Sequence, residues 1–185
     1  MRRIGFVVLA TIVLLGSAAM VYAGNGKAVP GWNGNPNHYT AISVTNVGTG
    51  EVSAKLVREK TPNAVLAQHM TALNACDWTG LMQQYPDQYE IRMPNGVTVT
   101  GRTDAGVLFA GFGDGGAMCG TKFEEVSRQQ VGGTILVTWK ASGTNSFGTI
   151  DGFYYGSDAY VTNDGLMVSM VSTFDAAAVK YVKDE

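Results

Sequence analysis

The sequence predicts an α+β protein in which a curved antiparallel sheet wraps around N-terminal helices and encloses an apolar pocket. Three observations lead to this fold class. Two helical segments meet without a loop near residue 76, a third helical segment follows a short hairpin, and the rest of the chain reads as consecutive strands. Because the helices come first and the antiparallel strands last, the helices can cover one face of the sheet. A sheet that curls around helices encloses a cavity.

The first 23 residues are typical of a secretory signal peptide. Arg2 and Arg3 form a basic start, an apolar run follows, and small residues precede position 24. We expect cleavage after Ala23 and a secreted or periplasmic protein. The alternative is an uncleaved anchor, since residues 4–23 are about long enough to span a bilayer. The protein would contact a membrane only in that case.

Residues 24–60 form an N-terminal extension that precedes the main domain at residues 61–185. Residues 24–37 are rich in Gly, Asn and Pro, as extended segments are. Residues 38–57 show β-branched alternation on both sides of a Gly-Thr-Gly turn, which is compatible with a hairpin.

Composition argues against several partners. The formal net charge is −2 and only 15% of residues are charged, so the chain lacks the cationic surface that a nucleic-acid partner requires. No Cys or His cluster has metal-ligand spacing, and we expect no metal and no other cofactor. The stretch "GFGDGG" at 111–116 formally fits a dinucleotide-binding pattern, but it does not connect a strand to a helix start.

The first helix is predicted over residues 62–76. Thr61 can cap it, and Pro62 suits the first helical position because its missing N–H bonds nothing there. One face of this helix carries apolar side chains and one histidine at spacings of three and four, namely Val65, Leu66, His69, Met70, Leu73 and Cys76.

The second helix starts at once, because Asp77 can cap it. It presents Trp78, Leu81, Met82 and Tyr85 on one side and ends before Pro86. The two helices should therefore meet at a capped corner and not through a loop.

The remaining elements are short strands, one helix and longer strands. Residues 89–102 form two strands around Pro94-Asn95-Gly96, a strong turn signal. A third helix at about 103–112 carries Val107, Leu108 and Phe112. Longer strands are predicted at 121–130, 133–141, 149–162 and 166–174, the last two joined by the turn at 162–165.

The chain has two cysteines, Cys76 and Cys119. In an exported protein an even pair predicts a disulfide bond. The alternative is two buried free thiols that pack as small apolar groups.

Three segments resemble a known family in collinear order over residues 62–175. "ALNACDWTGLMQQY" resembles the helix corner of ketosteroid isomerases and SnoaL-like polyketide cyclases, "MPNGVTVTGRTDAGVLFAGF" is similar to their strand–turn–strand and helix, and "GSDAYVTNDGLMVSMVSTF" is similar to their closing hairpin. The chain is identified on these segments as a member of the nuclear transport factor 2-like superfamily. The resemblance implies a cone, formed by a curved sheet around a long helix, with an apolar pocket at the wide end.

The resemblance also implies where catalytic groups would lie. The family's oxyanion tyrosine corresponds to His69, its general base to Met93, and its protonated strand aspartate to Asp158. A methionine cannot take up a proton, so only the aspartate survives. Steroid isomerisation by that mechanism is not expected, although some cyclases use a strand aspartate as acid and base.

Asp158 and His69 are the candidate catalytic residues. The period of a strand places Tyr154, Gly156, Asp158 and Tyr160 on one face, which the resemblance makes the pocket face. A carboxyl group among aromatic side chains would have a raised pKa, and a histidine titrates near neutrality. The sharpest hypothesis is therefore a His69–Asp158 pair across the pocket; the alternative for both is a satisfied structural residue.

The candidate ligand-binding residues are large apolar side chains for which a plain core role is the competing interpretation: Trp78, Met93, Phe112, Trp139, Tyr154, Tyr160, Met170 and Phe174. Phe109 is a candidate pocket-wall residue as well. Two functions follow from these residues. The first is a non-catalytic module that binds a small apolar molecule; the second is a cofactor-independent proton-transfer enzyme of isomerase, cyclase or dehydratase type.

The opposite face of the same strand offers a different interpretation. Phe153, Tyr155 and Val161 would point outward there and suit an apolar contact with a second copy of the chain. The sequence thus also predicts a homodimer formed through the sheet.

Overall fold

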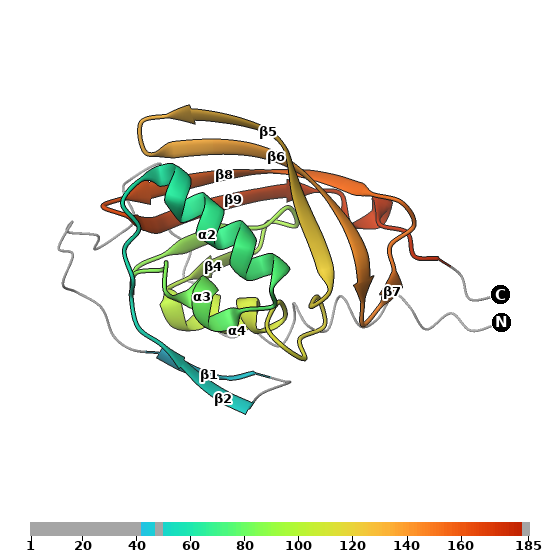
Figure 1. The fold of residues 1–185 in the computed structure, drawn as a ribbon, viewed down its shortest axis with the longest axis horizontal. Coiled ribbons are helices and arrows are strands. Elements are labelled where there is room, and N and C mark those ends of the chain that lie inside the picture. The colour runs from blue at the N-terminus through green and yellow to red at the C-terminus, as the bar shows by residue number, and fades with distance from the viewer. Residues whose placement is uncertain (1–41, 47–49, 183–185) are drawn as a thin grey trace.

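A computed structural model describes residues 42–46 and 50–182 (Figure 1). The predicted signal peptide and residues 24–41 of the extension lie outside the described residues. The described chain forms one seven-stranded sheet, one separate two-stranded sheet and three α-helices. The seven strands are β3 (Glu90–Arg92), β4 (Thr98–Thr100), β5 (Thr121–Val131), β6 (Thr134–Asn145), β7 (Gly148–Thr149), β8 (Tyr154–Asn163) and β9 (Leu166–Phe174).

The predicted curved, mainly antiparallel sheet is confirmed, and it also contains one parallel pair. Its strand order is β4-β3-β9-β8-β6-β5, with β7 paired to β6. β3 pairs parallel with β9, whereas the other pairs are antiparallel. A parallel pair needs a long crossover connection, and here the elements between β3 and β9, from β4 and α4 to β8, supply it. The sequence pattern of a three-residue strand could not reveal this partner.

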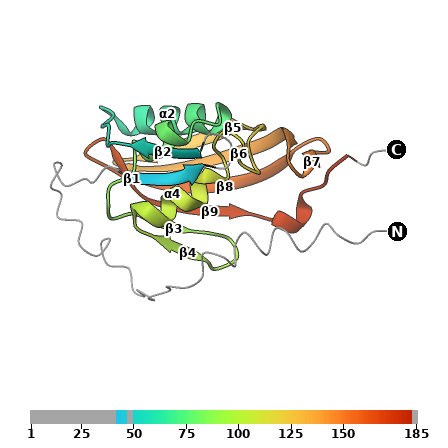
Figure 2. The same ribbon diagram turned by 90° about the horizontal axis from the view of Figure 1, so that it is seen from below.

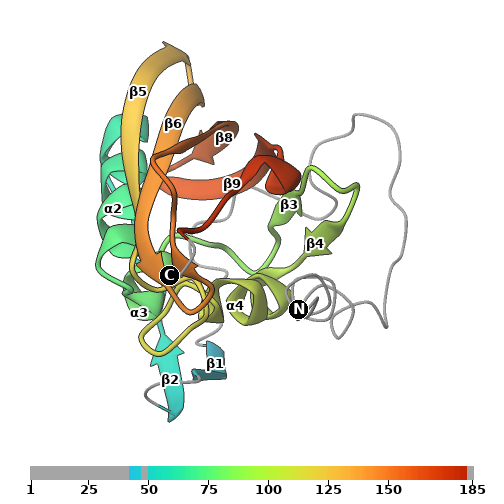
Figure 3. The same cartoon turned by 90° about the vertical axis from the view of Figure 1, so that its right-hand side faces the viewer.

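The sheet curls into an arch that spans from β5 to β4 (Figure 3). Two irregularities in register lie on this arch, one between Glu125 and Ser127 on β5 and one between Val161 and Thr162 on β8. A bulge bends its strand and increases the local twist. The curvature that the fold requires is therefore built into the strands themselves.

The long helix α2 (Pro62–Asn74) starts as predicted. Thr61 accepts a hydrogen bond from the Ala64 N–H, and Pro62 occupies the first helical turn. The helix ends two residues earlier than expected, at Asn74, because Cys76 adopts a left-handed backbone with φ of 57°. Its buried residues include Leu66 and His69 from the predicted face.

The capped corner between the helices is confirmed. The Asp77 carboxylate accepts from the Gly80 N–H at 2.9 Å, and α3 (Trp78–Met82) follows directly. This second helix is only five residues long, so Tyr85 lies beyond its end. Tyr85 is nevertheless fully buried, as are Trp78, Leu81 and Met82, with which the sequence pattern groups it.

The third helix, α4 (Arg102–Ala110), packs mainly through small residues, while Leu108 and Phe112, which the sequence pattern named, are partly buried against the core. Val107 is 56% exposed, whereas Ala105 and Gly106 are buried. A Cβ atom on Gly106 would lie 3.1 Å from Ile42 Cδ1, and the Gly106 carbonyl accepts from Trp78 Nε1 at 2.8 Å. Close approach of neighbouring elements thus selects small residues on the buried face, which a search for large apolar side chains misses.

The two-stranded sheet consists of β1 (Ile42–Asn46) and β2 (Gly50–Ala54), which pair antiparallel and lie beside the helices (Figure 2). Arg102 of α4 connects this hairpin to the helices through hydrogen bonds. Its guanidinium donates to the carbonyl groups of Ala54 and Met82, both at 3.0 Å. The buried side chains of Ile42 and Ala54 join the main core.

Cys76 and Cys119 form a disulfide bond. It connects the helix corner to the loop at residues 111–120, which joins α4 to β5. Within residues 42–46 and 50–182, no helix has the length and apolar character needed to cross a membrane.

Candidate functional site

The concave face of the sheet is assembled from alternate residues of three neighbouring strands. In the register of β6, β8 and β9, Asp158 lies opposite Val137 and Ser172, and the adjacent row contains Trp139, Gly156 and Phe174. These side chains belong to the buried face of each strand, as the period-two pattern predicts for β8. Two groups of aromatic residues meet on this face, one on either side of Asp158.

The first group, which we call the inner cluster, consists of His69, Tyr85, Tyr89, Phe109 and Tyr160. Tyr85 stacks on Tyr89 and on Phe109 with centroid distances of 4.3 and 5.1 Å. The His69 ring makes edge contacts with Tyr85, Phe109 and Tyr160 at 5.3–6.2 Å. No member is more than 3% exposed. Aromatic rings therefore fill the space around His69.

His69 is held in its neutral form by this environment. Burial lowers the pKa of its imidazole from 6.5 to about 4, and a contact with Gln84 opposes that shift. Its Nδ1 atom forms a hydrogen bond of 3.0 Å with the Tyr85 hydroxyl. The structure gives His69 and Asp158 different hydrogen-bond partners, and the Tyr160 side chain contacts both.

Asp158 lies between the two clusters. The Tyr160 hydroxyl donates to its Oδ2 atom at 2.7 Å. Burial raises the pKa of the carboxyl group, while hydrogen-bonding contacts with Ser172, Tyr160 and Trp139 oppose that rise. Burial beside Asp158 raises the pKa of the Tyr160 hydroxyl as well, so this hydroxyl keeps its proton and remains a donor.

Two buried polar atoms, one on Trp139 and one on Asp158, lack a hydrogen-bond partner among the described residues. Asp158 Oδ1 and Trp139 Nε1 are both buried, and neither has a hydrogen-bond partner of good geometry among the described residues. The indole N–H lies near enough to lower the pKa of the carboxyl group, but it does not reach a well-formed hydrogen bond with it. An acceptor and a donor are therefore left open on the same face.

The second group, which we call the rim cluster, consists of Phe112, Phe123, Trp139, Tyr154 and Phe174. Trp139 lies at its centre, with ring contacts to Phe123, Tyr154 and Phe174 at 5.3, 5.7 and 6.0 Å. Phe112 joins it through Phe123 at 6.2 Å. The three phenylalanines are only partly buried, so this cluster reaches the surface whereas the inner cluster does not.

Gly156 makes the position of Trp139 possible. A Cβ atom on residue 156 would overlap the Trp139 six-membered ring, so the indole lies directly against the β8 backbone. Tyr154 stands on the other side of this glycine along β8, and burial raises the pKa of its hydroxyl to about 12. The glycine therefore brings the indole to the row next to Asp158.

The other predicted ligand-binding residues are distributed elsewhere. Trp78 is the first residue of α3, and its indole N–H donates to the Gly106 carbonyl of α4. Met93 is partly buried in the turn that follows β3. Met170 is buried opposite Tyr160 in the β8–β9 register and beside Ile91 of β3.

Sequence reasoning missed Phe123 and Ser172. Phe123 is the single aromatic residue of a strand dominated by charged and polar side chains, and its contact with Trp139 depends on the β5–β6 pairing. Ser172 could have been found, because it alternates with Met170 and Phe174 on the same strand face.

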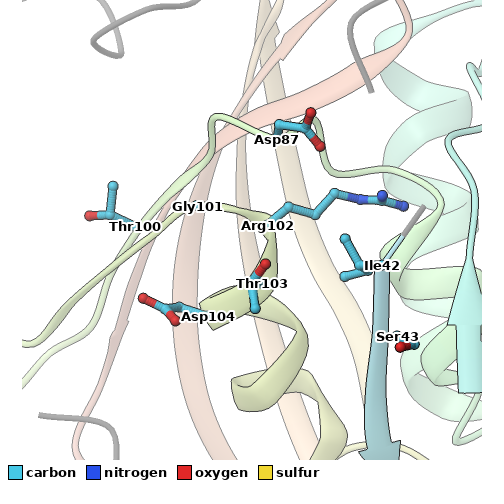
Figure 4. A pocket seen from close by; sticks show the side chains of 8 residues that line it. All are labelled: Ile42, Ser43, Asp87, Thr100, Gly101, Arg102, Thr103 and Asp104. Atoms are coloured by element: carbon cyan, nitrogen blue, oxygen red, sulfur yellow. The ribbon is translucent and has the colours of Figure 1, made fainter. Parts of the chain in front are cut away.

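Two surface hollows are described, and neither is lined by Asp158, His69 or the rim cluster. One, of about 560 Å³, lies beside the start of α4. Figure 4 shows the Arg102 side chain there, extending between the loop that carries Asp87 and Ile42 of β1. The other, of about 620 Å³, borders Pro62 and the turns at Gly132 and Asp164. Among the described residues, no group of three or more His, Cys, Asp or Glu side chains could hold a metal ion.

Comparison with known proteins assigns the fold. No protein-family model and no curated protein sequence matches the chain. Solved structures do. An NTF2-like protein of unknown function from Burkholderia pseudomallei superimposes with a TM-score of 0.53 at 13% identity, covering 64% of this chain and 94% of that one.

Two further solved structures carry descriptions of cyclase type. A putative polyketide cyclase from Pseudomonas putida gives a TM-score of 0.53 at 8% identity, covering 64% of this chain and 95% of its own. The epoxide hydrolase/cyclase-like enzyme SalBIII of salinomycin pyran ring formation gives 0.56 at 13%, covering 65% and 95%. The chain therefore has the nuclear transport factor 2-like cone fold that the sequence resemblance predicts.

Proposed function

We propose that the protein binds a small apolar molecule at the rim cluster, with Asp158 as the polar anchor, and that it does so without catalysis. One observation carries this proposal: a buried carboxyl group with an unsatisfied oxygen lies directly behind a partly exposed set of aromatic rings. Ligand sites are mostly apolar surfaces with a few placed polar groups.

The partly buried phenylalanines give such a molecule a point of entry. Phe123 and Phe174 contact Trp139 from two strands, and Phe112 contacts Phe123 from the loop after α4. Because Phe112 belongs to a loop, its displacement disturbs no strand pairing. A bound apolar ring would replace contacts between these side chains with contacts to itself, and the buried apolar area would supply the affinity.

Two features support binding over catalysis. By the sequence resemblance, Met93 corresponds to the family's general base, and a thioether does not accept a proton at neutral pH. Three aromatic rings enclose His69 and separate it from a molecule at the rim cluster. Its lowered pKa also makes the imidazole a weak base. Neither residue supplies a base that could act beside Asp158.

The experiment that tests this proposal is displacement of a neutral apolar fluorophore, N-phenyl-1-naphthylamine. We expect Phe174→Ser to weaken fluorophore binding about tenfold or more, because it removes a ring from the rim. Phe153→Ser is the matched control: it removes a phenylalanine that is 54% exposed and that precedes the same strand pair. Equal binding by both variants and the wild type would contradict the proposal, as would a lack of binding by the wild type. Mass spectrometry of small molecules that co-purify with the protein would then identify the natural ligand.

The second function, a cofactor-independent proton-transfer enzyme, is favoured by the raised pKa of Asp158. A carboxyl group shifted toward neutrality can both give and take a proton. In this alternative Asp158 and His69 act as acid and base, with Tyr160 between them. Its test is turnover of candidate apolar ketones and epoxides: Asp158→Asn and His69→Gln should both abolish it, and unchanged turnover would remove the alternative.

We propose that the protein is exported and that it pairs through the outer face of the sheet. The disulfide supports export, because such bonds persist in oxidising compartments. Phe153, Tyr155 and Val161 are 39–60% exposed, and Leu136 and Val171 on neighbouring strands are similarly exposed. Sedimentation of the wild type beside Tyr155→Ser tests the dimer; a monomeric wild type at high concentration would contradict it.

A further inference from the structure

We infer that Trp139 and Asp158 together select a hydroxyl group on the bound molecule, so that the ligands are apolar alcohols or phenols. This inference rests on the proposed binding function, because it assumes that a molecule reaches the rim cluster. It adds the chemical group that the site recognises and identifies Trp139 as the residue that determines specificity.

The two side chains are placed for one shared partner. Trp139 is on β6 and Asp158 on β8, in adjacent rows of the same concave face. They are 4% and 7% exposed, so water from the bulk solvent does not satisfy them. Each has one open polar atom, Trp139 Nε1 and Asp158 Oδ1.

The hydrogen-bonding chemistry of these atoms is complementary. An indole N–H can only donate. The Tyr160 hydroxyl donates to Oδ2 of the carboxyl group, and the Ser172 hydroxyl, which can also donate, contacts the same group. Among the described residues, Oδ1 itself has no partner with hydrogen-bond geometry. In these surroundings Oδ1 is the acceptor that is left. One side chain therefore lacks an acceptor and the other lacks a donor.

A hydroxyl group is the simplest ligand group that meets both needs, because its oxygen accepts while its hydrogen donates. A carbonyl oxygen would satisfy Trp139 alone. A hydrocarbon would satisfy neither, and a carboxylate cannot donate to Asp158 Oδ1. Sites built to hydrogen-bond a substrate group discriminate strongly against analogues that lack it, because their own buried polar atoms then stay unpaired.

The orientation of the indole is fixed by its neighbours. Phe123 and Tyr154 contact the ring edge-on with interplanar angles of 81° and 85°. Gly156 lets the same ring lie against the β8 backbone. Because two aromatic rings and the β8 backbone pack against the indole, its N–H cannot turn freely toward another acceptor.

The test compares dissociation constants of three probes of similar shape: 2-naphthol, 2-naphthaldehyde and naphthalene. The purified wild-type protein should bind 2-naphthol about tenfold or more tightly than either of the others. This comparison needs no variant. Preference for the aldehyde would overturn the inference and indicate that Asp158 donates a proton of its own. Equal binding of all three would also overturn it, because the open atoms would then be satisfied by each other or by a buried water molecule.

Variants assign the preference to its residues. Trp139→Phe keeps an aromatic ring and removes the N–H, so it should lower the preference for 2-naphthol over naphthalene severalfold while naphthalene binding changes little. Ser157→Ala, at the outward-facing position next to Asp158, is the matched control and should keep the full preference. An unchanged preference in Trp139→Phe would overturn the role of the indole. If no probe binds the wild type, the proposed binding function itself fails, which distinguishes that failure from a failure of selectivity.

Discussion

The inner cluster and the rim cluster both consist mainly of aromatic residues, but they differ in hydrogen bonding and in exposure to solvent. In the inner cluster, His69 forms a hydrogen bond with Tyr85, and aromatic rings enclose both side chains. No residue of this cluster is more than 3% exposed. In the rim cluster, Trp139 has an unpaired N–H and its phenylalanine neighbours reach the surface. The comparison teaches that aromatic content does not locate a binding site. An unsatisfied buried polar atom beside partly exposed rings is the more informative feature.

The largest expected effect is the loss of stability on removal of the disulfide bond between the helix corner and the loop that carries Phe112. The Cys76–Cys119 disulfide ties the end of α2, which carries His69, to the loop that carries Phe112. Replacing both cysteines with serine should lower the free energy of unfolding by about 4 kcal/mol, because a 43-residue separation no longer constrains the unfolded chain.

Chemical denaturation under non-reducing conditions measures this loss, and reduction of the wild type provides the control. Similar losses in the reduced wild type and the double variant would support the assignment. A loss below about 1 kcal/mol would mean that the loop carrying Phe112 is held in place without the bond.

The next effect is a pH dependence that belongs to the inner cluster. The pKa of His69 is about 4 in the folded protein and 6.5 in the unfolded chain. Between these values the unfolded state binds more protons, so stability should fall by about 3 kcal/mol as the pH drops from 6.5 to 4. Denaturation midpoints across this range, compared with those of His69→Gln, isolate the contribution. An identical slope in the variant would contradict the enclosure of His69.

Asp158 should produce the opposite slope. Burial raises the pKa of its carboxyl group above 3.8 in the folded state, so the folded protein holds this proton longer than the unfolded chain does. Its contribution to stability is therefore present at low pH and is lost as the pH rises through the folded-state pKa. Asp158→Asn should remove this component, and the same denaturation series measures it.

A substitution at Gly156 tests whether the indole lies where the rim cluster requires. The added Cβ of Gly156→Ala would overlap the Trp139 ring, and overpacking of this kind costs about 1–3 kcal/mol. The variant should also lose the preference for 2-naphthol, because the displaced indole no longer faces Asp158. Thermal unfolding and the probe titrations measure the two effects; a stable variant that keeps its selectivity would contradict the geometry.

The smallest effect is expected on the outer face of the sheet. Tyr155 is 60% exposed, so Tyr155→Ser should change the stability of the isolated chain by no more than about 0.5 kcal/mol. It should nevertheless shift the monomer–dimer equilibrium seen in sedimentation. A large loss of stability at low protein concentration would show that this face contributes to folding of the single chain.

The features that the sequence predicted correctly depend on local interactions. Thr61, Pro62 and Asp77 define helix ends through bonds within four residues, and strand alternation placed Asp158 on the buried face. The sequence pattern did not reveal the buried face of α4, because Gly106 is selected by its contacts with Ile42 and Trp78. Those contacts come from distant parts of the chain.

The arrangement around Asp158 could be predicted only in part. The large apolar side chains of Trp139, Tyr154 and Phe174 mark them as candidates in the sequence. Their convergence depends on the register of three strands and on the missing side chain of Gly156. The parallel pairing of β3 with β9 likewise joins segments separated by most of the domain. Neither the register nor the strand order is encoded in a short sequence pattern.

The most direct test of the account is a nuclear magnetic resonance titration that follows the Trp139 indole N–H while 2-naphthol is added to ¹⁵N-labelled protein. The account predicts that this resonance shifts downfield with saturation, together with the amides of Gly156 and Ser172. The amide of Tyr155 on the outward side of β8 should stay in place. Shifts confined to the outer face, or an indole resonance that does not move at saturating ligand, would contradict a hydroxyl-selective site at the rim cluster.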